Sequence, residues 1–477
     1  MLVLVPEIAL TPQLVGRFRR RLDSEMEVLH SGIPAGERRR RWMRIRDGQA
    51  HCVIGARSAI FAPLSNLGLV VIDEEHDGSY KQDENPRYNA RDLALWRAHH
   101  LNAVCLLGSA TPSLESFQRA SDGAMQLLSL PERVTGGRLP EVELVSLSPQ
   151  ISPRSTCHDD TDPEILTPRL LTALDETLNR KEQAILFLNR RGFANFIICA
   201  DCGEIVGCPN CSVSLTHHQF DSSLRCHYCD YQIPIPQSCR RCQSPRLIPF
   251  GLGTERLEAE VRQRFPEARV ARLDRDSTRR KGSLLSTLSR FGEGKIDILL
   301  GTQMLAKGHD YADITLAIIL GLDYILALPD YRARERAQSL FVQIAGRAGR
   351  AREATVIVQT NQPEFFSEYI GNYETFLKEE LASREGLYPP SMHLCRLLFA
   401  SKEEAKGLRE AQRVKEAIER FEKVEIVGAG KAPIEKIAGK FRFNILLRSP
   451  GRKDLLRVVK AVNDGTFEVD MDPVDIA

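Results

Sequence analysis

The chain has 477 residues, of which 43% are hydrophobic and 27% are charged, and its formal net charge is +2. This length exceeds what one hydrophobic core usually serves, so we expect about three domains. No apolar run is long enough to cross a bilayer, which predicts a soluble protein with no membrane partner. The small net charge identifies no other class of partner.

The first predicted element is a strand formed by the apolar run Met1–Val5, which Pro6 and Glu7 end. No basic segment precedes the run, so a signal peptide is excluded. The pattern is typical of a buried parallel strand. Because a chain rarely starts inside a central strand, we expect this sequence to lack the front of its protein.

Ten arginines lie between Arg17 and Arg46, and four of them are consecutive at 38–41. A basic segment of this kind can bind phosphate groups. The alternative is a solvated helix surface, which is the usual role of a charge run. Acidic residues interleaved with the arginines support this alternative: Asp23, Glu25, Glu27 and Glu37.

Residues 1–130 alternate short apolar strands with helical stretches, which predicts a parallel sheet with helices on both faces. In such sheets, functional side chains gather in the loops that follow the strands. The strands predicted in this first unit are residues 2–5, 53–55, 69–72 and 103–107.

The loop after the predicted strand at 69–72 has the sequence DEEH at 73–76. Phosphoryl transfer needs one carboxylate to hold Mg²⁺ and another to orient the attacking water. Asp73 and Glu74 are our candidates for these two roles. An acidic pair after a strand is common, so this motif alone does not establish the activity.

Residues 131–165 contain several prolines and an acidic cluster with little periodicity, which predicts a linker. A second α/β unit is predicted for 166–368, and a smaller α+β domain is predicted for 371–477. A cysteine-rich insertion at 196–246 interrupts the second unit after its first strand. The strands predicted in that unit are residues 183–188, 269–273, 296–300, 315–320 and 354–359.

Eight of the twelve cysteines form four Cys-x-x-Cys pairs in this insertion: Cys199 and Cys202, Cys208 and Cys211, Cys226 and Cys229, and Cys239 and Cys242. Without a secretory signal, this spacing favours metal over disulfides, and we place the protein in the cytoplasm. Zinc closes a tetrahedron with two such pairs, so the eight thiolates supply two structural zinc ions. An iron–sulfur cluster is a further alternative, but clusters usually take four cysteines in tighter spacing.

The zinc pairing has two geometrical solutions. In the nested form, the two inner pairs bind one ion, and Cys199 and Cys202 meet Cys239 and Cys242 at the base of the insertion. In the sequential form, the first four cysteines bind one ion and the last four bind the other. We favour the nested form and keep the sequential form as the alternative. Neither leaves a coordination position open, so a catalytic zinc is not expected.

Three further loops carry polar residues in positions where parallel-sheet enzymes place functional groups. The last, QIAGRAGR at 343–350, puts Arg347 and Arg350 three residues apart on one helical face. Two such guanidinium groups can act as arginine fingers on a γ-phosphate, although a surface ion pair is the ordinary alternative. The candidates in these loops are Ser109, Thr111, Gly301, Thr302, Gln343, Arg347 and Arg350.

In this order, DEEH, GSATP, GTQMLAKGHD and QIAGRAGR resemble the successive motifs of superfamily-two helicases. A finer resemblance is to the PriA family of primosomal replication-restart DNA helicases, and it covers nearly the whole chain. It rests on the eight-cysteine insertion and on LVPEIALTPQ at 4–13, LHSG at 29–32, GARSAIFAP at 55–63, FLNRRGF at 187–193 and VDMDPV at 469–474.

The resemblance implies an α/β protein with two RecA-like parallel-sheet lobes, of which the first is incomplete. The two-zinc insertion lies in the second lobe, and a small α+β domain follows it. The resemblance also implies ATP-dependent 3′→5′ movement on DNA, in restart of stalled replication forks and primosome assembly. The implied cofactors are ATP with Mg²⁺ and two structural zinc ions. The implied partners are forked or single-stranded DNA, primosome and replicative-helicase loading proteins, and single-stranded DNA-binding protein.

Carried over residue by residue, the resemblance implies that Asp73 holds Mg²⁺ and that Glu74 activates water. It implies that Ser109, Thr111, Gly301 and Thr302 link the ATP and DNA sites, and that the eight paired cysteines bind zinc. The residues that it implies sense ATP or couple hydrolysis to lobe closure are His76, Gln343, Arg347 and Arg350.

The phosphate-binding pattern Gly-x-x-x-x-Gly-Lys-Ser/Thr does not occur in the 477 residues. The segment 428–432 lacks the first glycine and the hydroxyl residue and is predicted to be a turn, and 251–255 is predicted to open a helix. Because that loop cradles the β- and γ-phosphates, we expect severely weakened ATP binding and an unpaired sheet edge in the first lobe. The alternative to a helicase is a non-catalytic, zinc-stabilised fragment that binds DNA or primosome proteins.

Overall fold

The computed structural model describes most of the chain, and it divides into two compact units, the first over Met1–Leu127 and the second from Leu128 onward. The described residues are 1–6, 11–22, 24–130, 140–146, 165–189, 196–209, 214–218, 223–226, 231–250, 254–273, 283–302, 305, 314–349, 353–437 and 439–474.

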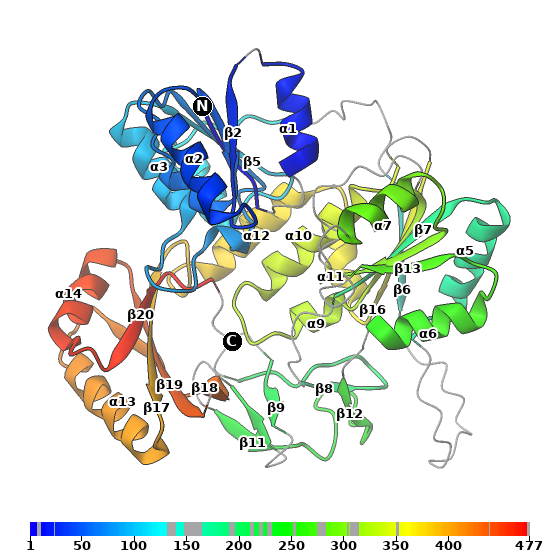
Figure 1. Cartoon of the computed structure of the whole chain (residues 1–477). Coiled ribbons are helices and arrows are strands. Elements are labelled where there is room, and N and C mark those ends of the chain that lie inside the picture. Colours follow the sequence, from blue (N-terminus) through cyan, green and yellow to red (C-terminus); the bar gives the residue numbers. More distant parts are fainter. Residues whose placement is uncertain are drawn as a thin grey trace. The chain divides into compact units, whose positions relative to one another are not determined.

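The first unit is built on a five-stranded parallel sheet in the order β2-β3-β1-β4-β5 (Figure 1). The strands are β1 (Leu2–Leu4), β2 (Met26–Leu29), β3 (Cys52–Gly55), β4 (Leu69–Asp73) and β5 (Val104–Gly108). The helices are α1 (Thr11–Arg19), α2 (Ala35–Arg46), α3 (Ala90–His100) and α4 (Leu114–Ser121), with short 3-10 helices at Arg57–Phe61 and Gly78–Tyr80.

Side chains of β1 alternate between two hydrophobic cores, one on each face of this sheet. Leu2 and Leu4 belong to the core that includes Ile45 of α2 and the alanines of α3. Val3 belongs to the opposite core, which includes Val15 of α1. Burial on both faces explains why the run has no polar alternation, as the sequence pattern predicted.

Within the described residues, β5 forms one edge of the sheet, and Val104 is 63% exposed there.

The second unit contains a six-stranded parallel sheet in the order β13-β14-β7-β15-β16-β6. The strands are β6 (Glu141–Ser146), β7 (Gln183–Leu188), β13 (Val270–Leu273), β14 (Ile298–Gly301), β15 (Ile314–Leu320) and β16 (Thr355–Thr360). The helices are α5 (Pro168–Asn179), α6 (Thr254–Arg264), α7 (Ser283–Gly292), α9 (Leu322–Leu326), α10 (Ala333–Ala345), α11 (Pro363–Glu368) and α12 (Tyr373–Arg384).

Two large cores cover the two faces of this sheet. Helices α5 and α6 contribute Leu170 and Leu257 to one core, and α7 and α10 contribute Phe291 and Phe341 to the other. All seven residues of β15 are buried, because this strand lies inside the sheet and has helices on both sides.

The structure differs from the sequence prediction at residues 141–146, which lie in the segment predicted to be a linker. They form the edge strand β6, and each of its residues is in register with a residue of β16. Glu143 and Arg169 form an ion pair across the surface of this edge, at 2.6 Å. The predicted linker is therefore a sheet strand over these six residues.

The insertion contains two small antiparallel sheets, β8 with β12 and β9-β10-β11. Their strands are β8 (Phe196–Cys199), β9 (Thr216–His218), β10 (Ser223–Arg225), β11 (Gln232–Pro234) and β12 (Leu247–Phe250). Phe196 packs edge-to-face on Tyr324 of α9, with 5.7 Å between the ring centroids, so the base of the insertion is seated on the second parallel-sheet lobe.

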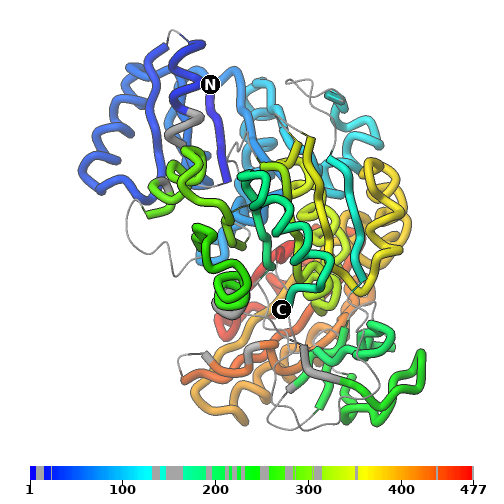
Figure 2. Tube along the Cα trace, turned by 90° about the vertical axis from the view of Figure 1, so that its right-hand side faces the viewer, coloured from blue at the N-terminus to red at the C-terminus, as the bar shows by residue number. Residues whose placement is uncertain are grey.

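The C-terminal domain is a four-stranded antiparallel sheet in the order β18-β19-β17-β20, covered on one face by α13 and α14. Its elements are β17 (His393–Ser401), α13 (Glu404–Ile418), β18 (Glu425–Ile437), β19 (Lys440–Ser449), α14 (Arg452–Val462) and β20 (Phe467–Met471). Figures 1 and 2 both show its orange strands beside the green insertion. Leu394, Leu446 and Leu224 of the insertion share a buried cluster there.

The prediction of a turn at 428–432 was wrong. These residues lie within β18, which pairs with β19 through two register shifts, one between Ile426 and Gly428 and one between Lys431 and Lys436. Glycines are frequent at such irregularities because the backbone must bend away from regular pairing. The prediction that α6 begins in the segment 251–255 agrees with its first residue, Thr254.

Two parallel-sheet lobes, a cysteine-rich insertion in the second and a C-terminal α+β domain confirm the predicted fold class. None of the helices in the described part of the chain combines the length and apolar character that spanning a membrane requires. The bounds 1–130, 166–368, 196–246 and 371–477 stay our proposal for the domains.

Candidate functional site

The DEEH loop and the GSATP loop lie side by side at one edge of the first sheet, because β4 and β5 are parallel neighbours and Asp73 is in register with Gly108. The Nδ1 atom of His76 lies 2.7 Å from the hydroxyl of Ser109. That hydroxyl also accepts a hydrogen bond from the backbone N–H of Thr111, at 2.9 Å. The structure thus brings both sets of candidate residues in the first lobe together.

Asp73 ends β4, and a buried tyrosine fixes its backbone. The Tyr80 hydroxyl lies 2.6 Å from the carbonyl oxygen of Asp73 and 3.1 Å from that of Leu4, so it bridges two neighbouring strands. Loss of contact with water raises the pKa of the Asp73 carboxyl, because it disfavours the charged form. A hydrogen bond from the backbone N–H of Glu74 and the nearby His76 both lower this pKa and so oppose the shift. A bound cation would favour the ionised carboxylate further.

Glu74 adopts a left-handed backbone conformation, with φ of 48°. For a residue with a side chain, this conformation costs about 1 to 3 kcal/mol and persists only where its surroundings impose it. Its carboxylate oxygen Oε2 lies 3.7 Å from Nδ1 of His76. The residue predicted to orient water is therefore also the strained residue of the loop.

Sequence reasoning missed Glu75, which is only 3% exposed. Its carboxylate accepts hydrogen bonds from the backbone N–H of Ser113 at 2.7 Å and from the hydroxyl of Ser116 at 2.8 Å. It also contacts the Ser113 hydroxyl and Nη1 of Arg91, each at 3.1 Å. Ser113 caps the N-terminus of α4, so Glu75 fastens the DEEH loop to that helix.

In the second lobe, Gly301 ends β14 where no side chain fits. A Cβ atom there would lie 2.6 Å from Leu305 and 3.0 Å from the carbonyl oxygen of Leu273. The N–H of Thr302 donates to the same carbonyl at 3.4 Å, so the chain turns away from the sheet at this point. These two candidates thus form the first part of the loop after β14.

Gln343 and Arg347 lie at the C-terminal end of α10. The Gln343 side chain donates to the hydroxyl of Ser339 at 2.8 Å, and Arg347 follows the helix with only 7% of its surface exposed. Gly349 has φ of 75°, a conformation that glycine adopts without strain. Arg350, the other predicted arginine finger, lies outside the described residues.

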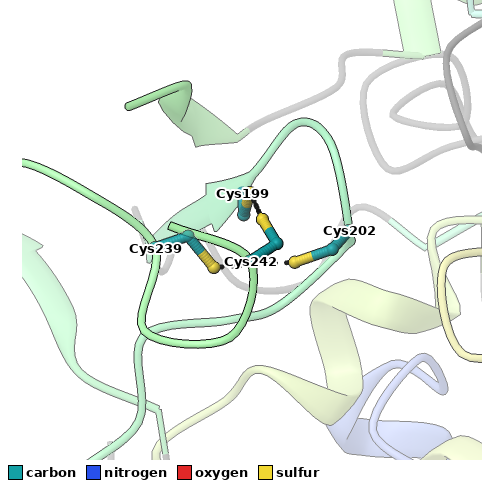
Figure 3. Close-up of side chains that lie close together, drawn as sticks. All are labelled: Cys199, Cys202, Cys239 and Cys242. Atoms are coloured by element: carbon teal, nitrogen blue, oxygen red, sulfur yellow. Dashed lines mark hydrogen bonds between the residues drawn. The ribbon is translucent and has the colours of Figure 1, made fainter. Parts of the chain in front are cut away.

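The outer four cysteines form one cluster, drawn in Figure 3, in which all four Sγ atoms lie within 4.8 Å of one another. The Sγ atoms of Cys199 and Cys242 are 3.6 Å apart, and those of Cys202 and Cys239 are 3.5 Å apart. Disulfide sulfurs would be about 2.05 Å apart. Thiolates that share one zinc ion at about 2.3 Å are separated by about 3.8 Å, so the cluster fits zinc.

The two halves of this cluster have the same backbone turn. Gly203 and Gln243, each one residue after a Cys-x-x-Cys pair, have positive φ values of 74° and 61°. Their N–H groups donate to the carbonyl oxygens of Cys199 and Cys239, at 3.0 and 2.9 Å. Two matching turns thus bring the four outer thiols together, which is the arrangement that the nested pairing predicts.

The inner zinc site stays a prediction. Cys208 and Cys226 are described, and Cys226 is fully buried in the cluster that joins the insertion to the C-terminal domain. Their predicted partners Cys211 and Cys229 lie outside the described residues.

The arginines at 38–41 of α2 have two different environments. Arg41 forms ion pairs with Glu37 and Glu27 and donates to the carbonyl oxygen of Val28. Arg38, Arg39 and Arg40 are exposed, and among the described residues their guanidinium groups have no ion pair. Of the four arginines at 38–41, these three are therefore the ones available to bind phosphates.

If this helix binds DNA phosphates, as the basic segment predicts, replacing Arg38, Arg39 and Arg40 together by glutamine weakens binding to double-stranded DNA and flattens its salt dependence. For every phosphate that the variant no longer neutralises, the slope of log affinity against log salt should fall by about 0.9. The matched control replaces Arg180, Arg262 and Lys295, which are exposed but already paired with carboxylates. An unaltered slope in the first variant would exclude phosphate contacts from this helix.

Four family models match the chain. They are described as DEAD/DEAH box helicase over residues 1–120 and helicase conserved C-terminal domain over 238–352. The others are PriA DNA helicase Cys-rich region domain over 208–234 and primosomal protein N C-terminal domain over 384–474.

The chain is also similar over its whole length to curated proteins called replication restart protein PriA. The one from Bacillus subtilis is 42% identical over 97% of this chain and 57% of the relative. The one from Haemophilus influenzae is 40% identical and the one from Helicobacter pylori is 38% identical, both over 100% of this chain. The chain spans 66% of the former and 75% of the latter. It is thus shorter than each of these relatives.

Proposed function

Because the chain belongs to the PriA family of replication restart proteins, we propose that it forms the motor part of an ATP-dependent DNA helicase that moves 3′→5′. The proposal includes a role in restarting stalled replication forks and in primosome assembly. Helicase family models over both lobes support it.

The observation that carries the proposal is the joined pair of loops in the first lobe. Asp73 and Glu74 stand where a parallel-sheet nucleotide hydrolase places its metal-binding and water-orienting carboxylates. The contact between His76 and Ser109, 2.7 Å long, ties this loop to the neighbouring GSATP loop. A shift in one loop therefore moves the other, as coupling of ATP hydrolysis to DNA movement requires.

The remaining candidates take roles in the same scheme. In it, Asp73 holds the Mg²⁺ of ATP, and Ser109, Thr111, Gly301 and Thr302 link the ATP and DNA sites. The residues proposed to sense ATP or to couple its hydrolysis to movement of the lobes are Gln343, Arg347 and Arg350. Zinc keeps the insertion folded, since a segment with few apolar residues cannot build a core of its own.

The proposed partners are forked or single-stranded DNA, primosome proteins, the loading proteins of the replicative helicase, and single-stranded DNA-binding protein. The reducing environment of the cytoplasm suits the unbridged thiols of the cysteine cluster. Weak ATP binding by the 477 residues on their own stays a prediction.

A chimaera that joins to this chain the part of the Bacillus subtilis relative that it does not span tests the function. We expect DNA-stimulated ATP hydrolysis and unwinding of duplexes with a 3′ single-stranded tail, but not of those with only a 5′ tail. DNA binding without any turnover would instead favour the non-catalytic alternative. Unwinding from a 5′ tail would contradict the proposed polarity.

A further inference from the structure

Glu75 is a buried carboxylate for which the proposed chemistry gives no role. It follows the strained residue Glu74 and precedes His76, so any shift of Glu75 moves both. Its backbone N–H donates to the carbonyl oxygen of Gly108 at 3.1 Å, and its side chain reaches past this point to α4. One residue thus binds both the end of β5 and the helix that follows the GSATP loop.

The surroundings of the Glu75 carboxylate are built for a charged acceptor. Oε1 accepts from the backbone N–H of Ser113, and Oε2 faces two serine hydroxyls and Nη1 of Arg91. Arg91 is itself buried and also donates to the Ser113 hydroxyl at 2.7 Å. A group with fewer acceptor sites cannot satisfy these donors, because both oxygens are in use.

We propose that Glu75 is a positioning residue that locks the DEEH loop to α4 and so holds Glu74 and His76 in their working geometry. The inference rests on the proposed function, since it assigns Glu75 to the coupling of ATP hydrolysis to the GSATP loop. Two parallel links then join the loops: the half-buried contact between His76 and Ser109, and the fully buried contact between Glu75 and Ser113.

Replacement by glutamine tests this role, because the side chain keeps its size but exchanges one acceptor oxygen for an NH₂ group. In the 477-residue chain, Glu75→Gln is expected to speed hydrogen exchange of the Ser113 amide by about tenfold or more, since the variant cannot form the charge-assisted bond. The ¹⁵N signal of the His76 ring should shift as its contact with Ser109 loosens. Amides in the middle of β4 should keep their protection.

In the chimaera that tests the function, the same substitution is expected to lower kcat of DNA-stimulated ATP hydrolysis by about tenfold, with KM for ATP within about twofold of the parent value. Asp92→Asn is the matched control. Its carboxylate lies 3.5 Å from Arg91 but is partly exposed and does not touch the loop, so both readouts should stay at the parent level.

If Glu75→Gln does not fold, Ser116→Ala removes one donor and leaves the pair with Arg91 intact. We then expect the same changes at a smaller size, of about two- to fivefold. Faster exchange at Ser113 with unchanged kcat and an unchanged His76 signal would overturn the proposal, because Glu75 would then only stabilise the fold. Should the parent chimaera not hydrolyse ATP, the proposed function fails by itself. The His76 signal of the 477-residue chain then decides: a shift supports the lock and no shift refutes it.

Discussion

Replacing Cys199 and Cys208 together by serine is expected to remove both zinc ions from the chain. In nested pairing these two cysteines belong to different sites, whereas in sequential pairing they share one. In small zinc domains, binding of the ion supplies about 10 to 16 kcal/mol of apparent folding free energy. Because binding and folding are coupled in this way, each site should lose its zinc ion once one of its ligands is removed. Metal content measured by mass spectrometry under native conditions gives the result directly.

The matched control for this experiment is the double variant Cys199→Ser, Cys242→Ser. Both thiols belong to the cluster in Figure 3, so one zinc ion should remain bound in the inner site. If the first variant kept one zinc ion and the control lost both, the sequential pairing would hold and our account of the insertion would be wrong.

The second large effect is expected from Glu74→Gln in the chimaera. A glutamine has no charge with which to draw a proton from the attacking water, so kcat of ATP hydrolysis should fall by about 10³-fold. ATP affinity should change little, because Asp73 still holds the metal. Steady-state hydrolysis and equilibrium binding of a fluorescent ATP analogue separate the two quantities.

Glu84→Gln is the control for that substitution, since Glu84 is an exposed acid in the loop before α3. It should hydrolyse ATP at the parent rate. Parent-like turnover by Glu74→Gln would remove Glu74 from the reaction, and equal losses in both variants would point to a general effect of charge.

The sequence was a sufficient guide wherever a strand is buried on both faces. All nine strands predicted for the two parallel sheets are present within two residues of their predicted bounds, because a short uninterrupted apolar run is typical of a strand that is buried on both faces. The loops after these strands were located by the same argument. That is why Asp73, Ser109 and Gly301 lie at strand ends.

Strands with a polar face were missed. In β2, the charged residue Glu27 interrupts the apolar pattern, yet it is buried because Arg44 of α2 pairs with it at 2.7 Å. In β6, the edge position leaves Glu141 and Ser146 exposed. The segment therefore lacks the continuous apolar run by which the other strands were predicted. A partner from a distant segment decides the structure in both cases, and single-sequence patterns do not contain it.

Glu75 was missed for a related reason. Its donors Ser113 and Ser116 lie 38 and 41 residues further along the chain and meet it only because β4 and β5 are neighbours. The spacing of these two serines at the start of a helix was the only sequence feature that pointed to a hydrogen-bond partner for Glu75. Such spacing ordinarily indicates no more than a helix cap.

The central claim is the proposed ATP hydrolysis, and the proposed role of Arg347 as an arginine finger is tested most directly by Arg347→Lys in the chimaera. Lysine keeps the positive charge but does not have the planar pair of donors that an arginine finger presents to the γ-phosphate. We predict that kcat falls by about 10³-fold while the protein stays folded at the assay temperature. Undiminished turnover in a folded Arg347→Lys protein would contradict the account.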